Sequence, residues 1–303
     1  GLSRRPRAWC DLKSGESTVR TPYIITGDRT APVHMDADRR LHVMGTVVDV
    51  DPKLFTGVYS GISEPPVLTG NVCVLRLPCA EDVEIPEEAE VVVVPNGYAL
   101  RKDPRKAVEQ IIRLRTKAGH NRILCILGLA EPSTLALYAY MGVDMFDDSL
   151  PRAAGVSGIR LISEGEIAAD GDVSAENAAD LATECWKVHR YINAERLREL
   201  VDQRSFSSPQ SVALLRIFDN VGYDYQEEMF STVGCRFSCN SVQALRRPDV
   251  VRYRRTIMER YRKPAHKRVL LLLPCSAKKP YHTSKTPKAF GTALHTAQPA
   301  TLV

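Results

Sequence analysis

Strand-like and helix-like patterns alternate between residues 90 and 146, and this alternation constrains the fold more than any other feature of the 303-residue chain. Apolar, β-branched runs bounded by Pro, Gly or Asp are typical of buried strands, whereas apolar residues three and four apart are typical of helices. The successive segments are EVVVVPN (90–96), DPRKAVEQIIRLRTKAG (103–119), RILCILG (122–128), EPSTLALYAYMG (131–142) and VDMF (143–146). This order predicts a parallel α/β fold, a class that includes the (β/α)₈ barrel.

The first of these helices carries its own start and stop signals. Asp103 is a candidate N-cap, Pro104 occupies the first helical position, and Gly119 follows the last periodic residue. Before this region, HVMGTVVDV (42–50) and NVCVLRLP (71–78) are predicted strands. The N-terminal hundred residues are therefore expected to be mainly β-strand and loop.

The chain turns helical after the α/β region. Predicted helices cover residues 174–203, 208–220 and 247–263, and an apolar strand is expected at 269–274. The chain begins with Gly and ends in ALHTAQPATLV, which resembles an interrupted element. It is therefore expected to be a C-terminally truncated piece of a longer protein.

Positive charge is concentrated in one stretch. Fourteen lysines and arginines face two acids between residues 246 and 288, so this stretch carries +12 and the rest of the chain −7, for a net charge of +5. A field of one sign favours a polyanion such as the phosphate backbone of nucleic acid, although a solvated basic helix without a partner is the alternative. Tyr253 and Tyr261 lie among the arginines and are candidates for stacking on bases. The candidate RNA-binding residues are Arg246, Arg247, Arg252, Arg254, Arg255, Arg262 and Lys263.

Composition also bears on the compartment. No apolar run approaches the roughly 20 residues of a membrane helix, and the N-terminus lacks the apolar stretch of a signal peptide. The eight cysteines are scattered, which in such a chain favours reduced thiols. A cytoplasmic protein without a membrane partner is expected.

An acidic pair follows the last strand of the α/β region. Asp147 and Asp148 stand where VDMF (143–146) ends. In a barrel the carboxyl ends of the strands build the active-site face, so Asp147 is a catalytic candidate. The alternative is that Asp147 caps a turn or pairs with Arg152.

The residues around this acid resemble a known family. Gly128-x-x-x-Pro132, a helix, GVDMFD (142–147) and then Leu-Pro-Arg (150–152) are similar to tRNA-guanine transglycosylases, which are (β/α)₈ enzymes that exchange a guanine of tRNA for a 7-deazaguanine base. The resemblance implies that Asp147 corresponds to their nucleophile. The family's Asp-Ser-Gly-Gly-Phe-Gln segment and its zinc pattern are absent. The resemblance therefore implies a degenerate transglycosylase-like barrel in which Asp147 is a remnant.

A second candidate site lies after the strand predicted at 269–274. In PCSAKKPYHTS (274–284), Cys275 follows the strand directly, and Lys278 and Lys279 would lower the pKa of its thiol. Strand ends of open α/β sheets are where ligands bind. The alternative is a buried structural cysteine beside solvent-exposed lysines.

The spacing of this segment resembles the signature of the archaeosine synthases, archaeal relatives of the transglycosylases. The matching positions are Pro274, Cys275, Lys279, Pro280, Tyr281 and Ser284, whereas Pro287 stands where the signature has His. Because Pro287 replaces this His, any catalytic role of the His is in doubt for this chain. His282 and His295 are candidates to take its place.

The second resemblance implies an activity. The family attaches an amine, lysine in its characterised reaction, to the nitrile of 7-cyano-7-deazaguanine in tRNA, and a partner radical enzyme then releases archaeosine. Cys275, Lys279, Tyr281 and Ser284 are the implied catalytic residues. The implied partners are tRNA and lysine, with the radical enzyme and a homodimer as further candidates, and no cofactor is implied.

Other functions remain open. One is base exchange by a transglycosylase that uses Asp147, and another is tRNA binding without catalysis. A Cys₃His zinc site is a further alternative, because Cys185 and His189, and likewise Cys235 and Cys239, have i, i+4 spacing.

Together these patterns predict an α/β protein in three parts. Residues 1–172 are expected to form the transglycosylase-like barrel domain and residues 173–263 a helical connecting region. Residues 264–303 are expected to begin a second α/β domain that carries the archaeosine synthase signature.

Overall fold

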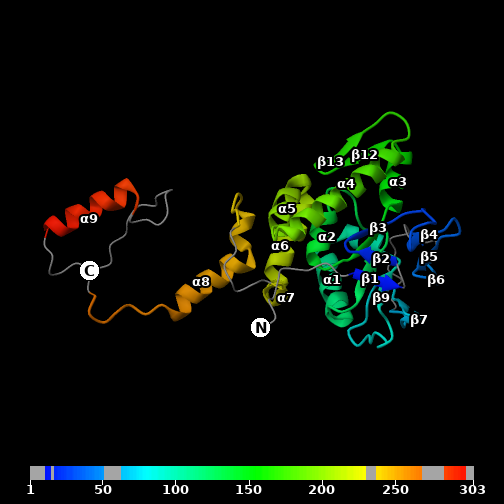
Figure 1. The fold of residues 1–303 in the computed structure, drawn as a ribbon, viewed down its shortest axis with the longest axis horizontal. Helices are drawn as coiled ribbons and strands as arrows, with labels where there is room; N and C mark the ends of the chain where they lie inside the picture. Colours follow the sequence, from blue (N-terminus) through cyan, green and yellow to red (C-terminus); the bar gives the residue numbers. More distant parts are fainter. Residues whose placement is uncertain (1–10, 15–16, 51–62, 230–236, 268–282, 298–303) are drawn as a thin grey trace. The chain divides into compact units, whose positions relative to one another are not determined.

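The computed structural model describes residues 11–14, 17–50, 63–229, 237–267 and 283–297. These residues fall into two compact units, which divide between Arg252 and Tyr253 (Figure 1). Each unit is described by itself.

A six-stranded sheet forms the centre of the first unit. Its strands are β3 (Tyr23–Ile25), β7 (Val67–Thr69), β8 (Val72–Val74), β9 (Val91–Val94), β10 (Ile123–Ile126) and β11 (Met145–Asp147), in the order β3-β11-β10-β9-β8-β7. All neighbours are parallel except β7 and β8. The predicted parallel α/β sheet is thus confirmed.

Two helices connect the parallel strands. α1 (Pro104–Ala118) begins as predicted, because the Asp103 carboxylate accepts hydrogen bonds from the backbone N–H groups of Arg105 and Lys106. It ends at Gly119, whose φ of 70° few other residues adopt. α2 (Leu135–Met141) starts later than predicted, since residues 131–134 form a turn before it.

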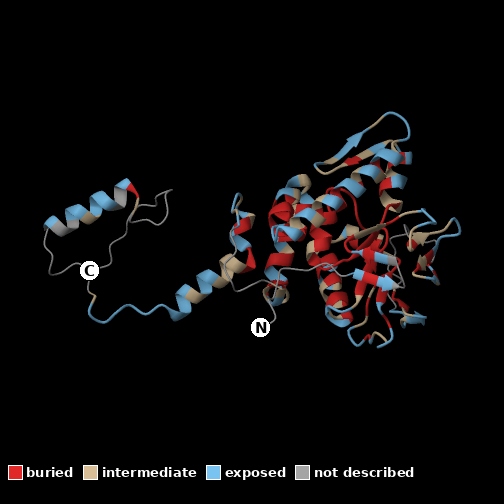
Figure 2. Cartoon of the chain, in the orientation of Figure 1, coloured by how far each residue is buried: buried red, intermediate tan, exposed pale blue. Residues whose placement is uncertain are grey.

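The two faces of the sheet pack against different partners. Val92, Val94 and Ile126 share a core with the helices, whereas Val91 and Val93 face the N-terminal strands. This division follows from the alternation of side chains along a strand. Burial is deepest in these central strands and in the helices that cover them (Figure 2).

Small antiparallel sheets surround the central one. They are β1 (Asp11–Ser14) with β2 (Ser17–Arg20), β4 (Val33–Met35) with β5 (Arg40–Val43) and β6 (Thr46–Asp49), and β12 (Ile159–Ile162) with β13 (Gly165–Ala168). The single strand predicted at 42–50 is wrong. The chain turns at Met44 and Gly45, which have φ of 48° and 92°, so this run forms most of a hairpin.

Further helices accompany α1 and α2 in the first unit. They include α3 (Ser149–Val156), α4 (Ser174–Asn193), α5 (Leu197–Arg204), α6 (Pro209–Val221) and α7 (Tyr223–Met229), with short 3₁₀ turns η1 (Gly97–Lys102), η2 (Ser205–Ser207) and η3 (Gln243–Arg246). The single helix predicted at 174–203 is interrupted, because Glu195 has φ of 57° and separates α4 from α5. Ser208 caps α6 by accepting from the backbone N–H of Ser211 at 3.0 Å.

The fold class is mixed α/β, and within the described residues the sheet is open, with β3 and β7 at its edges. The predicted closed barrel is therefore not found in this part of the chain. The six strands are too few to close at the usual eight, and β7 reverses direction at one edge.

The second unit holds most of α8 (Pro248–Arg260), which matches the helix predicted at 247–263, and also α9 (Lys285–Ala297). The strand predicted at 269–274 lies outside the described residues. None of the helices in the described ranges has the length and apolar character that crossing a membrane requires.

Candidate functional site

The carboxyl ends of β10 and β11 hold Asp147 in a closed setting. Its Oδ1 accepts a hydrogen bond from the backbone N–H of Gly128 at 2.6 Å, and its Oδ2 accepts one from the Ser149 hydroxyl. The residue is 3% exposed, and burial raises the pKa of its carboxyl above the ordinary value although both hydrogen bonds act in the opposite direction. Both oxygens are thus used within the protein.

Arg152 pairs with Asp148 rather than with Asp147, at 2.6 Å between Nε and Oδ2. Capping a turn and pairing with Arg152 were the two structural roles predicted for Asp147 as alternatives to catalysis. The contacts favour the turn. The Ser149 bond spans two residues where β11 passes into α3, which is the geometry of a turn-stabilising aspartate.

The backbone next to Asp147 is closely packed. A side chain at Gly97, which follows β9, would place its Cβ 2.3 Å from Cγ2 of Ile126 and 2.6 Å from the carbonyl oxygen of Leu127. Arg101 and Glu131 form an ion pair at 2.8 Å over the same strand ends. The close approach at Gly97 and the Arg101–Glu131 ion pair thus join the segments that follow β9 and β10.

Most of the predicted synthase site lies outside the described residues, namely Cys275, Lys279 and Tyr281. Ser284 is described. It precedes α9, is 6% exposed, and its hydroxyl has no hydrogen-bond partner among the described residues. Pro287 lies in the first turn of α9, where a helix needs no backbone N–H donor, so replacing His by Pro is compatible with this helix.

The predicted RNA-binding residues differ in exposure. Arg254, Arg255, Arg262 and Lys263 are exposed, as are Tyr253 at 67% and Tyr261 at 60%. Arg246 is exposed and donates to Oδ1 of Asn220 at 3.2 Å, while Arg252 is half-buried and pairs with Glu227 at 3.0 Å.

Arg247 is the exception in the predicted set. It is 3% exposed, pairs with Asp249 at 3.2 Å, and places its guanidinium 4.2 Å from the ring centre of Phe237. In this position its side chain packs within the first unit and is not exposed to solvent.

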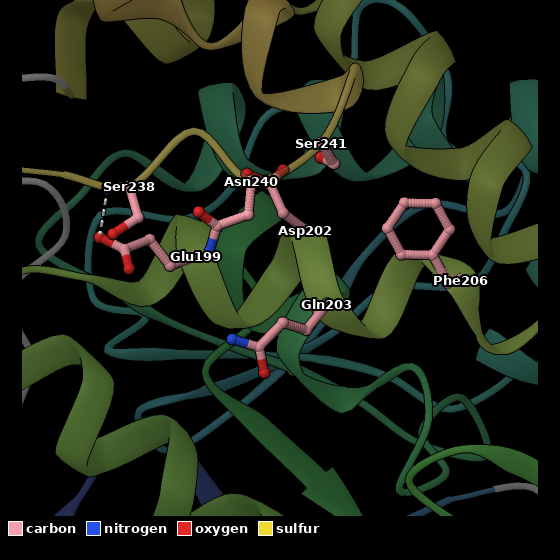
Figure 3. Close-up of a pocket in the computed structure, with 7 residues that line it drawn as sticks. All are labelled: Glu199, Asp202, Gln203, Phe206, Ser238, Asn240 and Ser241. Atoms are coloured by element: carbon pink, nitrogen blue, oxygen red, sulfur yellow. Dashed lines mark hydrogen bonds between the residues drawn. The ribbon is translucent and has the colours of Figure 1, made fainter. Parts of the chain in front are cut away.

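Sequence reasoning missed a groove beside α5, here called the α5 groove. Its volume is about 270 Å³, and four of its lining residues occupy one face of α5 and η2 at positions i, i+3, i+4 and i+7 (Figure 3). The segment 237–246 supplies the opposite wall, held by a hydrogen bond from the Ser238 N–H to Oε1 of Glu199 at 3.1 Å. The lining residues are Glu199, Asp202, Gln203, Phe206, Ser238, Asn240 and Ser241.

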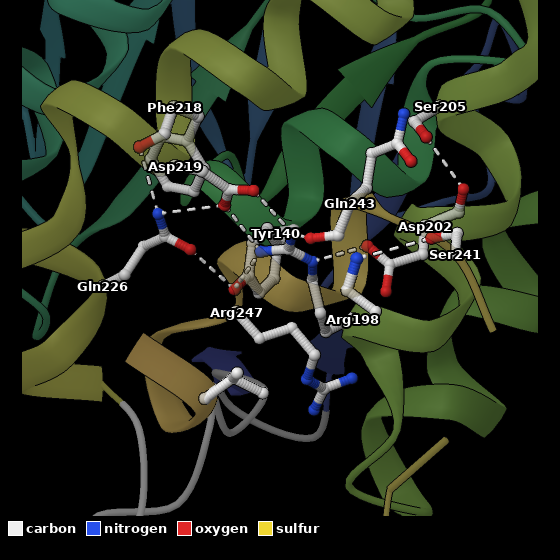
Figure 4. Close-up of polar contacts among 12 residues, drawn as sticks. Tyr140, Arg198, Asp202, Ser205, Phe218, Asp219, Gln226, Ser241, Gln243 and Arg247 are labelled. Atoms are coloured by element: carbon white, nitrogen blue, oxygen red, sulfur yellow. Dashed lines mark hydrogen bonds and ion pairs between the residues drawn. The ribbon is translucent and has the colours of Figure 1, made fainter. Parts of the chain in front are cut away.

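A buried polar network fixes α5 next to this groove (Figure 4). Arg198 makes two bonds of 2.7 Å to the carboxylate of Asp219 and one of 2.8 Å to Oδ1 of Asp202. The Tyr140 hydroxyl lies 3.4 Å from Arg198 and donates to Gln226 at 2.8 Å; burial raises the pKa of this hydroxyl well above its ordinary value. Because a bidentate arginine–carboxylate pair has fixed geometry, it holds α5 against α6.

The zinc alternative gains little support from the described residues. The Cys185 thiol lies 3.3 Å and His189 Nε2 lies 2.7 Å from the same backbone carbonyl, that of Pro22. Burial raises the pKa of Cys185 to about 12, which disfavours the thiolate that zinc binds. Cys239 is exposed, Cys235 lies outside the described residues, and the described residues contain no group of three metal-ligand side chains.

The amino-acid sequence of the chain is similar to those of several known proteins. The chain is 35% identical to the archaeosine synthase subunit alpha of Thermoplasma acidophilum over 67% of its length, and 30% identical to the subunit alpha of Methanosarcina acetivorans over 68%. It is 27% identical to the archaeosine synthase of Haloferax volcanii over 68% of its length. The chain is a relative of the archaeosine synthases. The resemblance predicted from its sequence is thereby confirmed.

These archaeosine synthase relatives are much longer than the chain, which spans 38–39% of each of the three. Residues 250–303 match a separate family model described as a domain of unknown function (DUF5591). That match covers α9 and the segment in which Cys275, Lys279 and Tyr281 are predicted to act.

Proposed function

We propose that the protein acts in archaeosine biosynthesis by modifying tRNA, as an enzyme of the transferase class. The observation that carries the proposal is the 35% identity to a protein named archaeosine synthase subunit alpha. The positions that match the family signature, from Pro274 to Ser284, support the same activity.

The proposed reaction adds the amine of lysine to the nitrile carbon of 7-cyano-7-deazaguanine in tRNA. The amine must be neutral, and the nitrile nitrogen must receive a proton as negative charge develops on it. Lys279 or Tyr281 supplies that proton. The product is an amidine, and no group leaves.

Cys275 has two roles open to it. In a covalent route its thiolate attacks the nitrile carbon to give a thioimidate, which the amine then converts to the amidine as the thiolate leaves. In direct addition Cys275 is structural. Ser284, buried at the start of α9 with no described partner for its hydroxyl, is placed next to this loop in the sequence.

The exposed cations of α8 and the residues after it are proposed to hold the tRNA backbone. Arg254, Arg255, Arg262 and Lys263 present four charges, and the exposed rings of Tyr253 and Tyr261 stand among them. Phosphate contacts of this kind position a nucleic acid without reading its sequence.

The first unit is proposed to be a remnant of a transglycosylase-like barrel. β8, β9, β10 and β11 are neighbours in chain order, and both connecting helices pack on one face. Barrels wind in this sequential way, whereas doubly wound sheets reverse direction and carry helices on both faces. Residues 1–172, 173–263 and 264–303 remain our proposed division into barrel domain, helical region and signature domain.

Base exchange at Asp147 is the second candidate, and the observed contacts argue against it. A nucleophile needs a free oxygen facing the substrate, but Gly128 and Ser149 take both oxygens of this carboxyl. Binding of tRNA without catalysis is the third candidate, favoured by Pro287 in place of the signature His.

Mass spectrometry of nucleosides tests the proposal. tRNA that carries the cyano base is incubated with lysine and the full natural chain, as wild type, Cys275→Ala, Lys279→Ala, and Cys239→Ala as a cysteine control. A mass gain of one lysine on the modified base, retained in Cys239→Ala and lost in Lys279→Ala, is expected. Release of the cyano base without an adduct would instead support base exchange, and tRNA binding with no change of mass would support the non-catalytic candidate.

The charges of α8 are tested by the salt dependence of tRNA binding. Arg254→Gln with Arg255→Gln is expected to lower affinity and to reduce the slope of log affinity against log salt by up to about 2. Lys102→Gln with Arg105→Gln, which changes two exposed cations near α1, is the matched control and should leave the slope unchanged. Equal slopes in all three proteins would remove α8 from the RNA-binding surface.

A further inference from the structure

The α5 groove combines polar groups that have no hydrogen-bond partner among the described residues with an exposed aromatic ring. The side-chain amides of Gln203 and Asn240 make no hydrogen bond to other described residues, and both residues are exposed. Oδ1 of Asp202 accepts from Arg198, but Oδ2 has no donor among the described residues although the side chain is only 10% exposed. Phe206 is 59% exposed at the end of the same helix face.

We propose that the α5 groove binds one nucleobase, stacked on Phe206 and hydrogen-bonded along its edge. A base offers a flat face for the ring, and its edge offers donors and acceptors for amide and carboxylate groups. Stacking on an aromatic side chain tolerates any base, because every base has a π-face. Asparagine and glutamine amides supply both a donor and an acceptor, which suits the mixed edge of a base.

The size of the groove limits the ligand to a single small group. Its volume of about 270 Å³ lies just below the usual range of pockets that hold drug-sized molecules. One base and part of its sugar match this space better than a run of nucleotides. Phe206 and Glu199 lie at opposite ends of the face of α5 and η2 that lines the groove. The Phe206 ring and the Glu199 carboxylate therefore flank the space between them (Figure 3).

The charges of the groove favour a neutral ligand. The Glu199 carboxylate already pairs with Arg196 and accepts a hydrogen bond from the Ser238 N–H. It is therefore a weak binding partner for a cationic amine. The uncommitted oxygen of Asp202 repels a phosphate. A neutral ring with N–H donors satisfies this oxygen without opposing either ion pair.

The oxygen of Asp202 also predicts which bases bind. A carboxylate oxygen accepts from the exocyclic amino groups of guanine, adenine and cytosine, and guanine adds a neighbouring ring N–H. Uracil has no amino group and offers one ring N–H only. Guanosine is therefore expected to bind most tightly and uridine least.

The base comes from one of two sources, a free nucleoside or an unpaired nucleotide of RNA. The second source rests on the proposed function, since it takes the base from the bound tRNA. Unpaired bases of folded RNA are commonly recognised by stacking on aromatic side chains together with contacts to the base edge.

Equilibrium binding to the full chain tests the proposal. Guanosine and uridine are titrated by ligand-observed NMR, and tRNA by fluorescence anisotropy, against wild type, Phe206→Ala, Gln203→Ala and Trp186→Ala. Trp186 is the matched control because it is also an aromatic residue with 59% exposure, on α4 away from the lining set. Asp202 is left unchanged because it pairs with the buried Arg198.

Phe206→Ala is expected to weaken guanosine binding about tenfold, and Gln203→Ala to weaken it less, with Trp186→Ala equal to wild type. If the source is RNA, Phe206→Ala also weakens tRNA binding while leaving its salt slope unchanged, since no phosphate contact is lost. If the source is a free nucleoside, tRNA affinity stays equal in all four proteins.

Two results would overturn the proposal. One is nucleoside binding that Phe206→Ala leaves unchanged, and the other is the lack of nucleoside binding together with equal tRNA affinity in every variant. Both are separable from failure of the proposed function. Nucleoside binding without tRNA binding would refute the modification of tRNA and leave the base site standing. Modification of tRNA with no nucleoside binding and equal tRNA affinity in every variant would do the opposite.

Discussion

Asp147 and Asp202 are both nearly buried aspartates of the first unit, yet their surroundings give them opposite capacities. Asp147 ends a central strand, and donors of the protein take both of its oxygens. Asp202 lies on a helix, with one oxygen bound to Arg198 and the other directed to no described donor. The comparison teaches that position at a strand end, the usual sign of an active site in barrels, is a weaker guide to function here than the hydrogen bonds left unmade.

The largest predicted effect on stability is at Arg198, the arginine that pairs with Asp202. Arg198→Ala would leave the Asp202 and Asp219 carboxylates buried without their partner, so we expect the free energy of unfolding to fall by about 3–5 kcal/mol. Urea denaturation measures the change. Arg105→Ala, which removes a pair whose arginine is 62% exposed, should cost no more than about 1 kcal/mol. A similar loss in both variants would show that the network does not fix α5.

The next effect is the pH dependence of stability that arises from Asp147. Burial raises the pKa of Asp147, so the folded protein holds this proton more tightly than the unfolded chain does. The stabilisation from protonation is complete below the ordinary pKa of about 4 and is lost as pH rises through the raised value. Relative to wild type, Asp147→Asn should therefore gain free energy of unfolding between pH 4 and pH 7, as measured by urea denaturation. If the free energies of unfolding of the two proteins changed in parallel with pH, the raised pKa of Asp147 would be contradicted.

Asp147→Ala provides a second measure of the closed site. It leaves the Gly128 N–H without its acceptor, and we expect a loss of about 1–3 kcal/mol of unfolding free energy. Because the contacts of Asp147 are within the protein, the affinity for tRNA should not change. A variant that folds as well as wild type but loses tRNA modification would restore a catalytic role for this residue.

A smaller effect is expected at the turn that sets the direction of α5. Glu195 has φ of 57°, a conformation that costs residues with a Cβ roughly 1–2 kcal/mol. Glu195→Gly should relieve this strain and raise the free energy of unfolding by up to about 1 kcal/mol, after the entropy cost of glycine. A melting curve of the variant tests the sign, and destabilisation would mean that the Glu195 side chain has a contact of its own.

The smallest effects are expected in the open groove. Phe206→Ala and Gln203→Ala remove exposed side chains, so each should change the free energy of unfolding by about 0.5 kcal/mol or less. Denaturation of these variants also supports the binding experiments, because a change in ligand affinity is then not a change in folding. A loss above about 2 kcal/mol would show that Phe206 is packed rather than open.

The sequence was a good guide wherever local signals decide structure. The strands at 90–96 and 122–128, the cap at Asp103 and the stop at Gly119 were all predicted, because periodicity and capping are properties of neighbouring residues. The hairpin at Met44 and Gly45 and the break at Glu195 were missed. Apart from Gly45, these turns use residues that do not favour positive φ, so no local signal marks them.

The α5 groove was beyond sequence reasoning for a different cause. The i, i+3, i+4, i+7 spacing of Glu199, Asp202, Gln203 and Phe206 is visible in the sequence, but it is also the pattern of an ordinary solvated helix face. What turns it into a groove is segment 237–246, which is far away along the chain. Only tertiary contacts bring the two together.

The pairing of β3 with β11 has a consequence for how the protein is made. Tyr23 lies in register with Met145, so the edge of the sheet stays unfinished until more than a hundred intervening residues have left the ribosome. Contacts so distant in sequence slow folding, since the chain must close a long loop before they form. The nascent chain is thus predicted to leave β3 unpaired until β11 has been synthesised, and this is when aggregation would most readily compete with folding.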